Sequence, residues 1–176
     1  MVNTVYPPVT VVDENDREVG SAMLADVWRQ GLYHRIVSVF LLDDKGRMLL
    51  QLRDPHAKIY PSCWDQAASG HVDEGFSYDQ AATTELEEEV GLRDVTLEVL
   101  GTFRANIKLD DGRLVNQFER AYLARVPYDT VLKPELEEVS EVRWFTSAEL
   151  RTQIAKHPKG FTPGLLHALR LYFPDF

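Results

Sequence analysis

The chain has 176 residues, of which 44% are hydrophobic, and it carries a formal net charge of -9 at pH 7. That length suffices for one domain with a sizeable core, so we expect a lead-in over residues 1–8 and a single domain over residues 9–176. The acidic balance argues against non-specific binding to nucleic acid or anionic membranes, although a local basic pocket can still bind a small anion.

Cys63 is the only cysteine in the sequence. A lone cysteine excludes an intramolecular disulfide and is typical of a reducing compartment. No apolar run reaches the length of about 18 residues that a membrane helix needs, and residues 1–16 lack a basic segment followed by an apolar one. We therefore expect a cytoplasmic protein that is neither secreted nor membrane-spanning.

The N-terminal part predicts a hairpin and then a short helix. Residues 9–12 and 18–20 flank the polar segment 13–16, which suits a turn between two strands. Residues 22–30 have helical character, and Gly31 stands where a glycine ends a helix.

Two β-rich runs follow, over residues 34–42 and 47–53, joined by a turn that ends in Lys45–Gly46. They predict an antiparallel pair of strands. Residues 54–63 contain two prolines and predict a loop, and residues 64–69 predict one short strand.

An acidic helix is predicted next, over residues 78–90. Ser77 and Asp79 are suitable N-terminal caps, and Gly91 suits the C-terminal end. The apolar residues within it recur at helical spacing.

Glu85, Glu88 and Glu89 stand at positions i, i+3 and i+4 of this helix and so lie on one face, while Glu87 points elsewhere. Like charges at this spacing cost roughly 0.2 to 0.5 kcal/mol per pair unless a cation arrives. Oxygen ligands without thiolates suit Mg²⁺ or Mn²⁺. On charge spacing alone, a solvated acidic face explains the pattern as well.

The remaining strands are predicted over residues 95–107, 114–126 and 139–145, with an irregularity at Gly101 in the first and a turn at residues 110–112. Ser147 is expected to cap a helix with Leu150 and Ile154 inward. Thr162–Pro163 is expected to open the last helix. Together the elements predict an α/β fold, a mixed β-sheet flanked by helices.

The segment 70–92 resembles the Nudix box, G-x5-E-x7-R-E-U-x-E-E-x-G-U, where U is a bulky aliphatic residue. Seven of its nine fixed positions match without a gap: Gly70, Glu85, Leu86, Glu88, Glu89, Gly91 and Leu92. Phe76 stands in place of the family's glutamate, and Thr84 in place of its arginine.

The resemblance extends over most of residues 9–150, to a Nudix branch related to isopentenyl diphosphate isomerase. It implies the Nudix-type α/β/α sandwich and a metal-dependent pyrophosphohydrolase. By this resemblance Gly70 (through its carbonyl), Glu85, Glu88 and Glu89 bind Mg²⁺ or Mn²⁺. The expected partner is a small diphosphate-containing molecule, such as a nucleoside diphosphate-X, rather than nucleic acid or a membrane.

Two basic residues and one acidic residue outside the box complete the expected site. Arg53 and Lys58 lie near the strand that leads into the acidic helix and could hold phosphate oxygens, unless they are simply solvated cations. Glu119 is the first choice for a general base, ahead of Glu138 and Glu141, because its strand should pass near the acidic helix.

His34 and His71 match metal ligands of the isomerases, but Val115 and Gln117 stand where those enzymes place glutamates. We therefore expect the two histidines to line a pocket or to bond to the backbone. Ser69 stands where the isomerases carry an essential cysteine, and its hydroxyl is far less acidic than a thiol.

The departures at Phe76 and Thr84 leave a second functional class open, a Nudix-fold ligand-binding or regulatory protein that has lost hydrolysis. In the family the arginine orients the neighbouring glutamate, and a threonine cannot. The paired loss suggests a coupled exchange that avoids one unpaired buried charge. We expect Phe76 to pack against the start of the helix.

Overall fold

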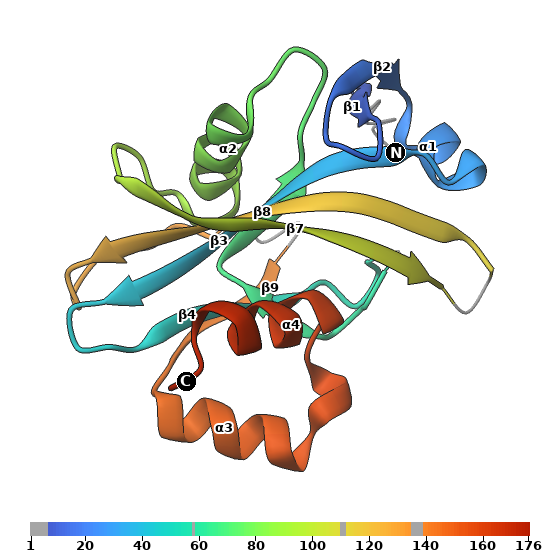
Figure 1. Cartoon of the computed structure of the whole chain (residues 1–176). Coiled ribbons are helices and arrows are strands. Elements are labelled where there is room, and N and C mark those ends of the chain that lie inside the picture. Colours follow the sequence, from blue (N-terminus) through green and yellow to red (C-terminus); the bar gives the residue numbers. More distant parts are fainter. Residues whose placement is uncertain (1–6, 58, 110–111, 135–138) are drawn as a thin grey trace.

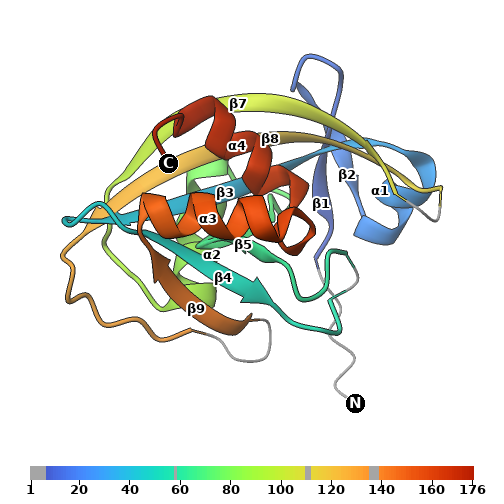
Figure 2. The ribbon, with the colours of Figure 1, turned by 90° about the horizontal axis from the view of Figure 1, so that it is seen from below.

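The computed structural model describes residues 7–57, 59–109, 112–134 and 139–176. A mixed β-sheet forms the centre of the molecule. Helix α2 (Tyr78–Val90) covers one face of it, and α3 (Ser147–Lys156) and α4 (Pro163–Tyr172) cover the other (Figures 1 and 2). This arrangement confirms the predicted α/β/α sandwich. No helix in the described ranges is both long and apolar enough to cross a membrane.

The N-terminal elements follow the prediction. Strands β1 (Val9–Val12) and β2 (Glu18–Ala22) form an antiparallel hairpin, and α1 (Leu24–Gln30) ends at Gly31, whose φ of 65° is left-handed. Glycine adopts this conformation without the steric cost that a Cβ brings.

Strand β3 (Tyr33–Asp43) organises the sheet. It pairs in parallel with β8 (Leu114–Val126) along its whole length, and it pairs antiparallel with β1, β4 and β6. The remaining strands of the described sheet are β4 (Met48–Arg53), β5 (Trp64–Gln66), β6 (Ala68–His71), β7 (Leu97–Lys108) and β9 (Val139–Phe145). The expected irregularity at Gly101 is a register shift in the β7–β8 pairing.

The prediction of one strand over residues 64–69 is wrong, because the chain breaks at Ala67 into β5 and β6. These two strands have different partners: β5 pairs with β4, and β6 pairs with β3. The break moves the chain from one neighbour to the next, and it brings Gly70 beside the centre of β3.

The predicted N-cap of α3 is also wrong. Thr146, not Ser147, is the N-cap of α3, and its side chain accepts from the Glu149 N–H in a capping box. Ser147 instead donates to the Asp175 carbonyl. Leu150 is fully buried, and Thr162 and Pro163 open α4, both as predicted.

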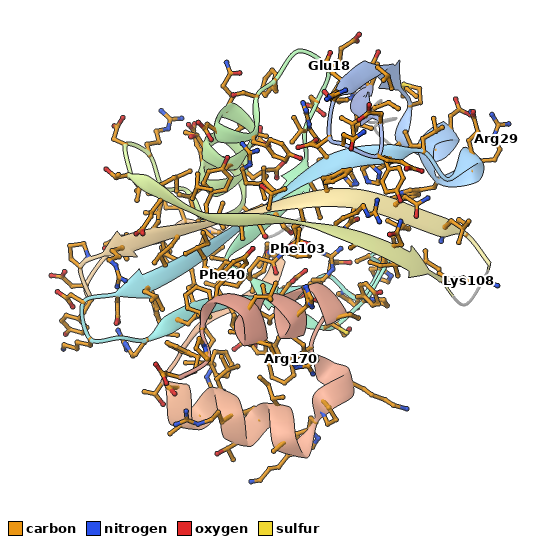
Figure 3. All side chains as sticks on the ribbon, viewed as in Figure 1. Glu18, Arg29, Phe40, Phe103, Lys108 and Arg170 are labelled. Atoms are coloured by element: carbon orange, nitrogen blue, oxygen red, sulfur yellow. The ribbon has the colours of Figure 1, made fainter. Side chains whose placement is uncertain are left out.

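Successive side chains of β3 point to opposite faces of the sheet and enter two separate cores. Val37 and Val39 belong to the core beneath α2, while Phe40 belongs to the core on the α3–α4 side. On that second side the ring of Phe40 lies 5.0 Å from that of Phe173, and Phe103 lies 4.7 Å from His167 of α4 (Figure 3). The two cores fix the helices against both faces of the sheet.

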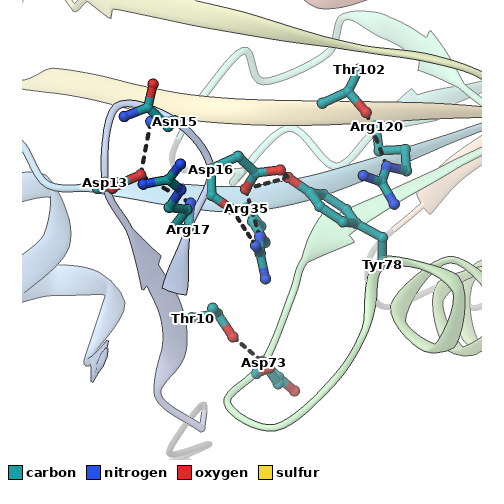
Figure 4. Close-up of polar contacts among 10 residues, drawn as sticks. All are labelled: Thr10, Asp13, Asn15, Asp16, Arg17, Arg35, Asp73, Tyr78, Thr102 and Arg120. Carbon is teal, nitrogen blue, oxygen red and sulfur yellow. Dashed lines mark hydrogen bonds and ion pairs between the residues drawn. The ribbon is translucent and has the colours of Figure 1, made fainter. Parts of the chain in front are cut away.

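The start of α2 is held by a polar cluster (Figure 4). The Tyr78 hydroxyl donates to Asp16 in the β1–β2 turn, 3.1 Å from its carboxylate oxygens, and Arg35 Nε lies 2.7 Å from the same carboxylate. The guanidinium carbon of Arg120 lies 3.9 Å from the Tyr78 ring centroid. Because Ser77 and Gln80 add a capping box, both local and distant contacts set the position of α2.

Candidate active site

Gly70 lets the helix approach the sheet. A Cβ built on Gly70 would stand 1.8 Å from Oε1 and 2.0 Å from Cδ of Glu85. The Glu85 carboxylate therefore lies directly against the backbone of β6. It occupies the space that the side chain of any other residue at position 70 would fill.

Glu89 lies one helical turn further along α2 and is buried, with 6% of its surface exposed. Its Oε2 accepts from Gln51 Nε2 at 2.5 Å, and its Oε1 accepts from the Ser69 N–H at 3.3 Å. Glu85 and Glu89 thus meet consecutive residues of β6, Ser69 and Gly70, so their carboxylates converge on one short piece of backbone.

Glu88 does not join them in the interior. It is exposed, and Glu87 forms an ion pair with Arg93. Positions i+3 and i+4 lie on opposite sides of position i, roughly 100° apart, so the helix can bury one of these two glutamates and leave the other at the rim. Within the described residues no group of three or more His, Cys, Asp or Glu side chains is arranged to hold a metal ion.

The donors that do converge still suit a hard divalent ion. Glu85 and Glu89 supply carboxylate oxygens, and the close approach at Gly70 leaves a backbone carbonyl next to them. Small hard cations are commonly held by one or two carboxylates, with water and substrate phosphates completing the shell. The residues present therefore fit such an ion without a third buried acid.

A pocket of ≈ 210 Å³ opens beside Gly70. It brings together residues from six strands, among them Arg53, Ser69, Gly70, His71, Gln117 and Glu119. Three site residues expected from the sequence, Arg53, Gly70 and Glu119, thus line one cavity. Lys58 lies outside the described residues.

Glu119 is one of two acids that line this pocket, the other being Asp65. It is 3% exposed, and its Oε1 accepts from Ser38 Oγ at 2.7 Å. Burial raises the pKa of Glu119 to about 7, the hydrogen bond from Ser38 opposes that rise, and the charge of Asp65 adds to it. This carboxyl therefore exchanges its proton near neutral pH, as a general acid or base requires.

Arg53 is held at the pocket by two contacts. Its Nη1 lies 3.3 Å from Asp65 Oδ2, and its Nε donates to the Ile59 carbonyl at 3.3 Å. Thr162 Oγ1 donates to Asp65 Oδ1 at 2.6 Å, and burial raises the pKa of the Asp65 carboxyl. Asp65 thus links the guanidinium to the first turn of α4.

The two histidines stack on each other, with ring centroids 5.3 Å apart. His71 lines the pocket, as expected, whereas His34 is fully buried behind it. Burial lowers the pKa of His34 to about 4 and that of His71 to about 3, so both rings are neutral at pH 7. His71 therefore gives the pocket a neutral wall.

Phe76 is not buried at the start of the helix as expected, because 41% of its surface is exposed. Its N–H closes a tight turn onto the Asp73 carbonyl, with Gly75 at φ 82°. The buried aromatic residue at the start of α2 is Tyr78, which is only 5% exposed.

Gln51 and Asp65 were missed by the sequence analysis. Both are polar residues in strands and both are buried, at 3% and 6% exposure. A single polar residue inside the apolar run MLLQLR was the signal available for Gln51, because a buried amide needs a partner.

The NUDIX domain model matches residues 32–165, which is most of the chain. The chain therefore belongs to the Nudix family. This confirms the resemblance carried by the segment 70–92.

Relatives within the family carry two kinds of name. An isopentenyl-diphosphate delta-isomerase of Nocardia farcinica is 36% identical over 166 residues, covering 93% of each chain. An uncharacterised Nudix hydrolase of Pseudomonas aeruginosa is 37% identical over 161 residues, covering 92% of this chain and 90% of the relative.

Solved structures share the fold. DR0079 from Deinococcus radiodurans superposes with a TM-score of 0.77 at 22% identity, covering 94% of this chain and 99% of that one. The Nudix domain of Shewanella oneidensis NrtR, solved in complex with ADP ribose, superposes with a TM-score of 0.56 at 22% identity, covering 68% of this chain and 77% of that one.

Proposed function

We propose that the chain is a pyrophosphohydrolase that uses Mg²⁺ or Mn²⁺ to cleave the diphosphate linkage of a nucleoside diphosphate-X or similar small molecule. The observation that carries the proposal is the convergence of Glu85 and Glu89 on Ser69 and Gly70, beside a pocket that contains Arg53 and Glu119. Family membership and the lone cysteine are consistent with a cytoplasmic enzyme of this class.

Each residue has a role in this proposal. Glu85, Glu89 and the Gly70 carbonyl hold the ion. The exposed Glu88 binds it from the solvent side of the site. The bound ion would polarise the diphosphate and lower the pKa of a water molecule. Gln51 and the Ser69 N–H fix the Glu89 carboxylate, so its lone pairs keep one orientation.

Arg53 and Glu119 act on the substrate. Arg53, with Lys58 as its proposed companion, binds phosphate oxygens. Glu119, buried and titrating near neutrality, takes the proton of the attacking water. The neutral histidines add no positive charge, so an anionic substrate relies on Arg53 and Lys58 for its charge partners.

The test is hydrolysis of a panel of diphosphate compounds, including ADP-ribose and diadenosine tetraphosphate, with Mg²⁺ or Mn²⁺. We expect turnover of at least one compound by the parent chain, loss of that turnover with chelator, and loss in Glu89→Gln. Turnover that survives in Glu89→Gln, or its absence across the panel, contradicts the proposal.

A ligand-binding or regulatory role is the second candidate, and Thr84 is the observation that favours it, because the family's orienting arginine is missing. A protein of this kind binds a diphosphate compound saturably without cleaving it. Calorimetry on the same panel separates this role from the enzyme: binding without turnover supports it, and no binding removes it.

Isomerase chemistry is a third candidate because relatives 36% identical carry that name. Ser69 argues against it, since a hydroxyl is a far weaker acid than a thiol for moving an allylic proton. Exchange of deuterium from solvent into isopentenyl diphosphate tests it directly.

A further inference from the structure

Trp28 of α1 lines two separate cavities. One is the ≈ 210 Å³ pocket beside Gly70, and the other is a more open groove of ≈ 620 Å³. Inside the pocket the ring centroid of Trp28 lies 6.2 Å from that of His71. The indole is therefore a wall that the two cavities share.

The outer groove lies between the end of α1 and the start of β8. Its described lining includes Arg29, Gly31, Arg113 and Leu114 and contains no acidic residue, although Arg29 itself pairs with the neighbouring Asp26. The guanidinium carbon of Arg113 lies 5.4 Å from the Trp28 ring centroid. The described groove thus combines an aromatic ring with two arginine side chains.

The volumes of the two cavities indicate which part of a ligand each can hold. Pockets that enclose a drug-sized molecule measure about 300 to 1,000 Å³. The inner pocket, at ≈ 210 Å³, is smaller than this, and the outer groove, at ≈ 620 Å³, lies within the range. A diphosphate with a small substituent fits the inner pocket, but a second bulky group needs the outer groove.

We infer that Trp28 is a specificity-determining residue for diphosphates that carry a nucleotide-type group, a planar heterocycle joined to sugar and phosphate. The diphosphate lies at Gly70 and Arg53, and the heterocycle stacks on the Trp28 indole within the outer groove, where Arg113 faces it. This inference rests on the proposed function, because the diphosphate site of that proposal sets where the group begins.

The test compares a bulky and a compact diphosphate. With ADP-ribose as substrate, we expect Trp28→Ala to raise KM about tenfold with kcat unchanged, while KM for methyl diphosphate, which meets Trp28 only in the inner pocket, rises by a clearly smaller factor. Trp28→Phe, which keeps a ring, recovers most of the loss. Equal changes for both compounds, or no change for either, overturn the inference.

A spectroscopic arm does not depend on turnover or on the stability of the alanine variant. ADP-ribose should quench tryptophan fluorescence of the parent and of the control Trp144→Phe. It should leave Trp28→Phe unquenched although calorimetry still detects binding. Quenching that persists in Trp28→Phe, or failure of the parent to bind ADP-ribose, contradicts the inference. If the parent binds but cleaves neither compound, hydrolysis fails while this arm still decides the role of Trp28.

Discussion

The Glu85 carboxylate occupies the space that a side chain on Gly70 would need: a Cβ on Gly70 would stand 1.8 Å from the Glu85 Oε1 atom, far closer than unbonded heavy atoms come. The glycine at this position of β6 is therefore required by a side chain on α2, not by its own backbone angles, since its φ is not left-handed.

Replacing this glycine tests whether the contact serves metal binding. Gly70→Ala should displace the Glu85 carboxylate, and we expect affinity for Mn²⁺ to fall about tenfold or more. The melting temperature should change little, because the clashing atoms end a flexible side chain. Equilibrium titration of Mn²⁺ and thermal unfolding measure the two quantities. Gly160→Ala is the matched control, because its Cβ would meet only His157, at 3.9 Å. Unchanged Mn²⁺ affinity in Gly70→Ala would show that Glu85 does not bind the ion.

Gln51 is expected to orient Glu89, whose carboxylate it meets at 2.5 Å in the interior. Gln51→Leu removes a donor from a buried carboxylate, so the free energy of unfolding should fall by about 1 to 3 kcal/mol, and Mn²⁺ affinity should fall with it. A double-mutant cycle with Glu89→Leu, followed by denaturant unfolding, isolates the pair. Additive effects of the two changes would mean that the residues are not coupled.

Glu119 should give the rate its pH dependence. As a general base it works when deprotonated, so kcat/KM should rise with pH through an apparent pKa near 7, and Glu119→Gln should abolish the rise. Because the Ser38 hydrogen bond lowers the pKa of Glu119, Ser38→Ala should move the profile to higher pH. A profile that keeps its midpoint in Ser38→Ala would assign the titration to another group.

The same carboxyl should affect stability in the opposite direction. The folded state holds the Glu119 proton up to about pH 7, whereas an unfolded glutamic acid loses it near its ordinary value of 4.5. Stability from this group is therefore fully present below pH 4.5 and is lost as pH rises toward 7, a change on the order of 3 kcal/mol. Glu119→Gln should remove this slope from unfolding measured between pH 4.5 and 8.

Restoring the two residues in which the chain departs from the Nudix box should increase its activity. Phe76→Glu with Thr84→Arg restores the family's charges, and we expect hydrolysis to rise about tenfold, equivalent to about 1.4 kcal/mol of barrier. Phe76→Glu alone should leave the melting temperature nearly unchanged, because Phe76 is 41% exposed. Steady-state rates and melting curves of the single and double variants decide the point. A double variant no faster than the parent would mean that more than two residues separate this site from the family pattern.

Local sequence patterns predicted most of the helices and strands. The bounds of α2 follow from the Ser77 cap and the terminal Gly91, and the structure reproduces both. The break at Ala67 could not be predicted, because it depends on which strands β5 and β6 meet. Pairing between segments distant in sequence leaves no trace in the local pattern.

The proposed metal-binding residues of the candidate site came from the motif, but the residues that support them could not be predicted. Motif spacing identified Gly70, Glu85 and Glu89, whereas the partners Gln51 and Asp65 depend on strand register and burial. The prediction for Phe76 was wrong because an apolar residue type indicates only a preference for burial, and the buried aromatic residue at the start of α2 is Tyr78.

Diffraction from crystals soaked in Mn²⁺ tests the central claim most directly, because anomalous scattering locates the ion without any assumption about substrate. The account predicts an anomalous peak within bonding distance of Glu85, Glu89 and the Gly70 carbonyl, and no such peak in crystals of Glu89→Gln. A parent crystal without a peak at these oxygens, or with the ion bound elsewhere, would contradict it.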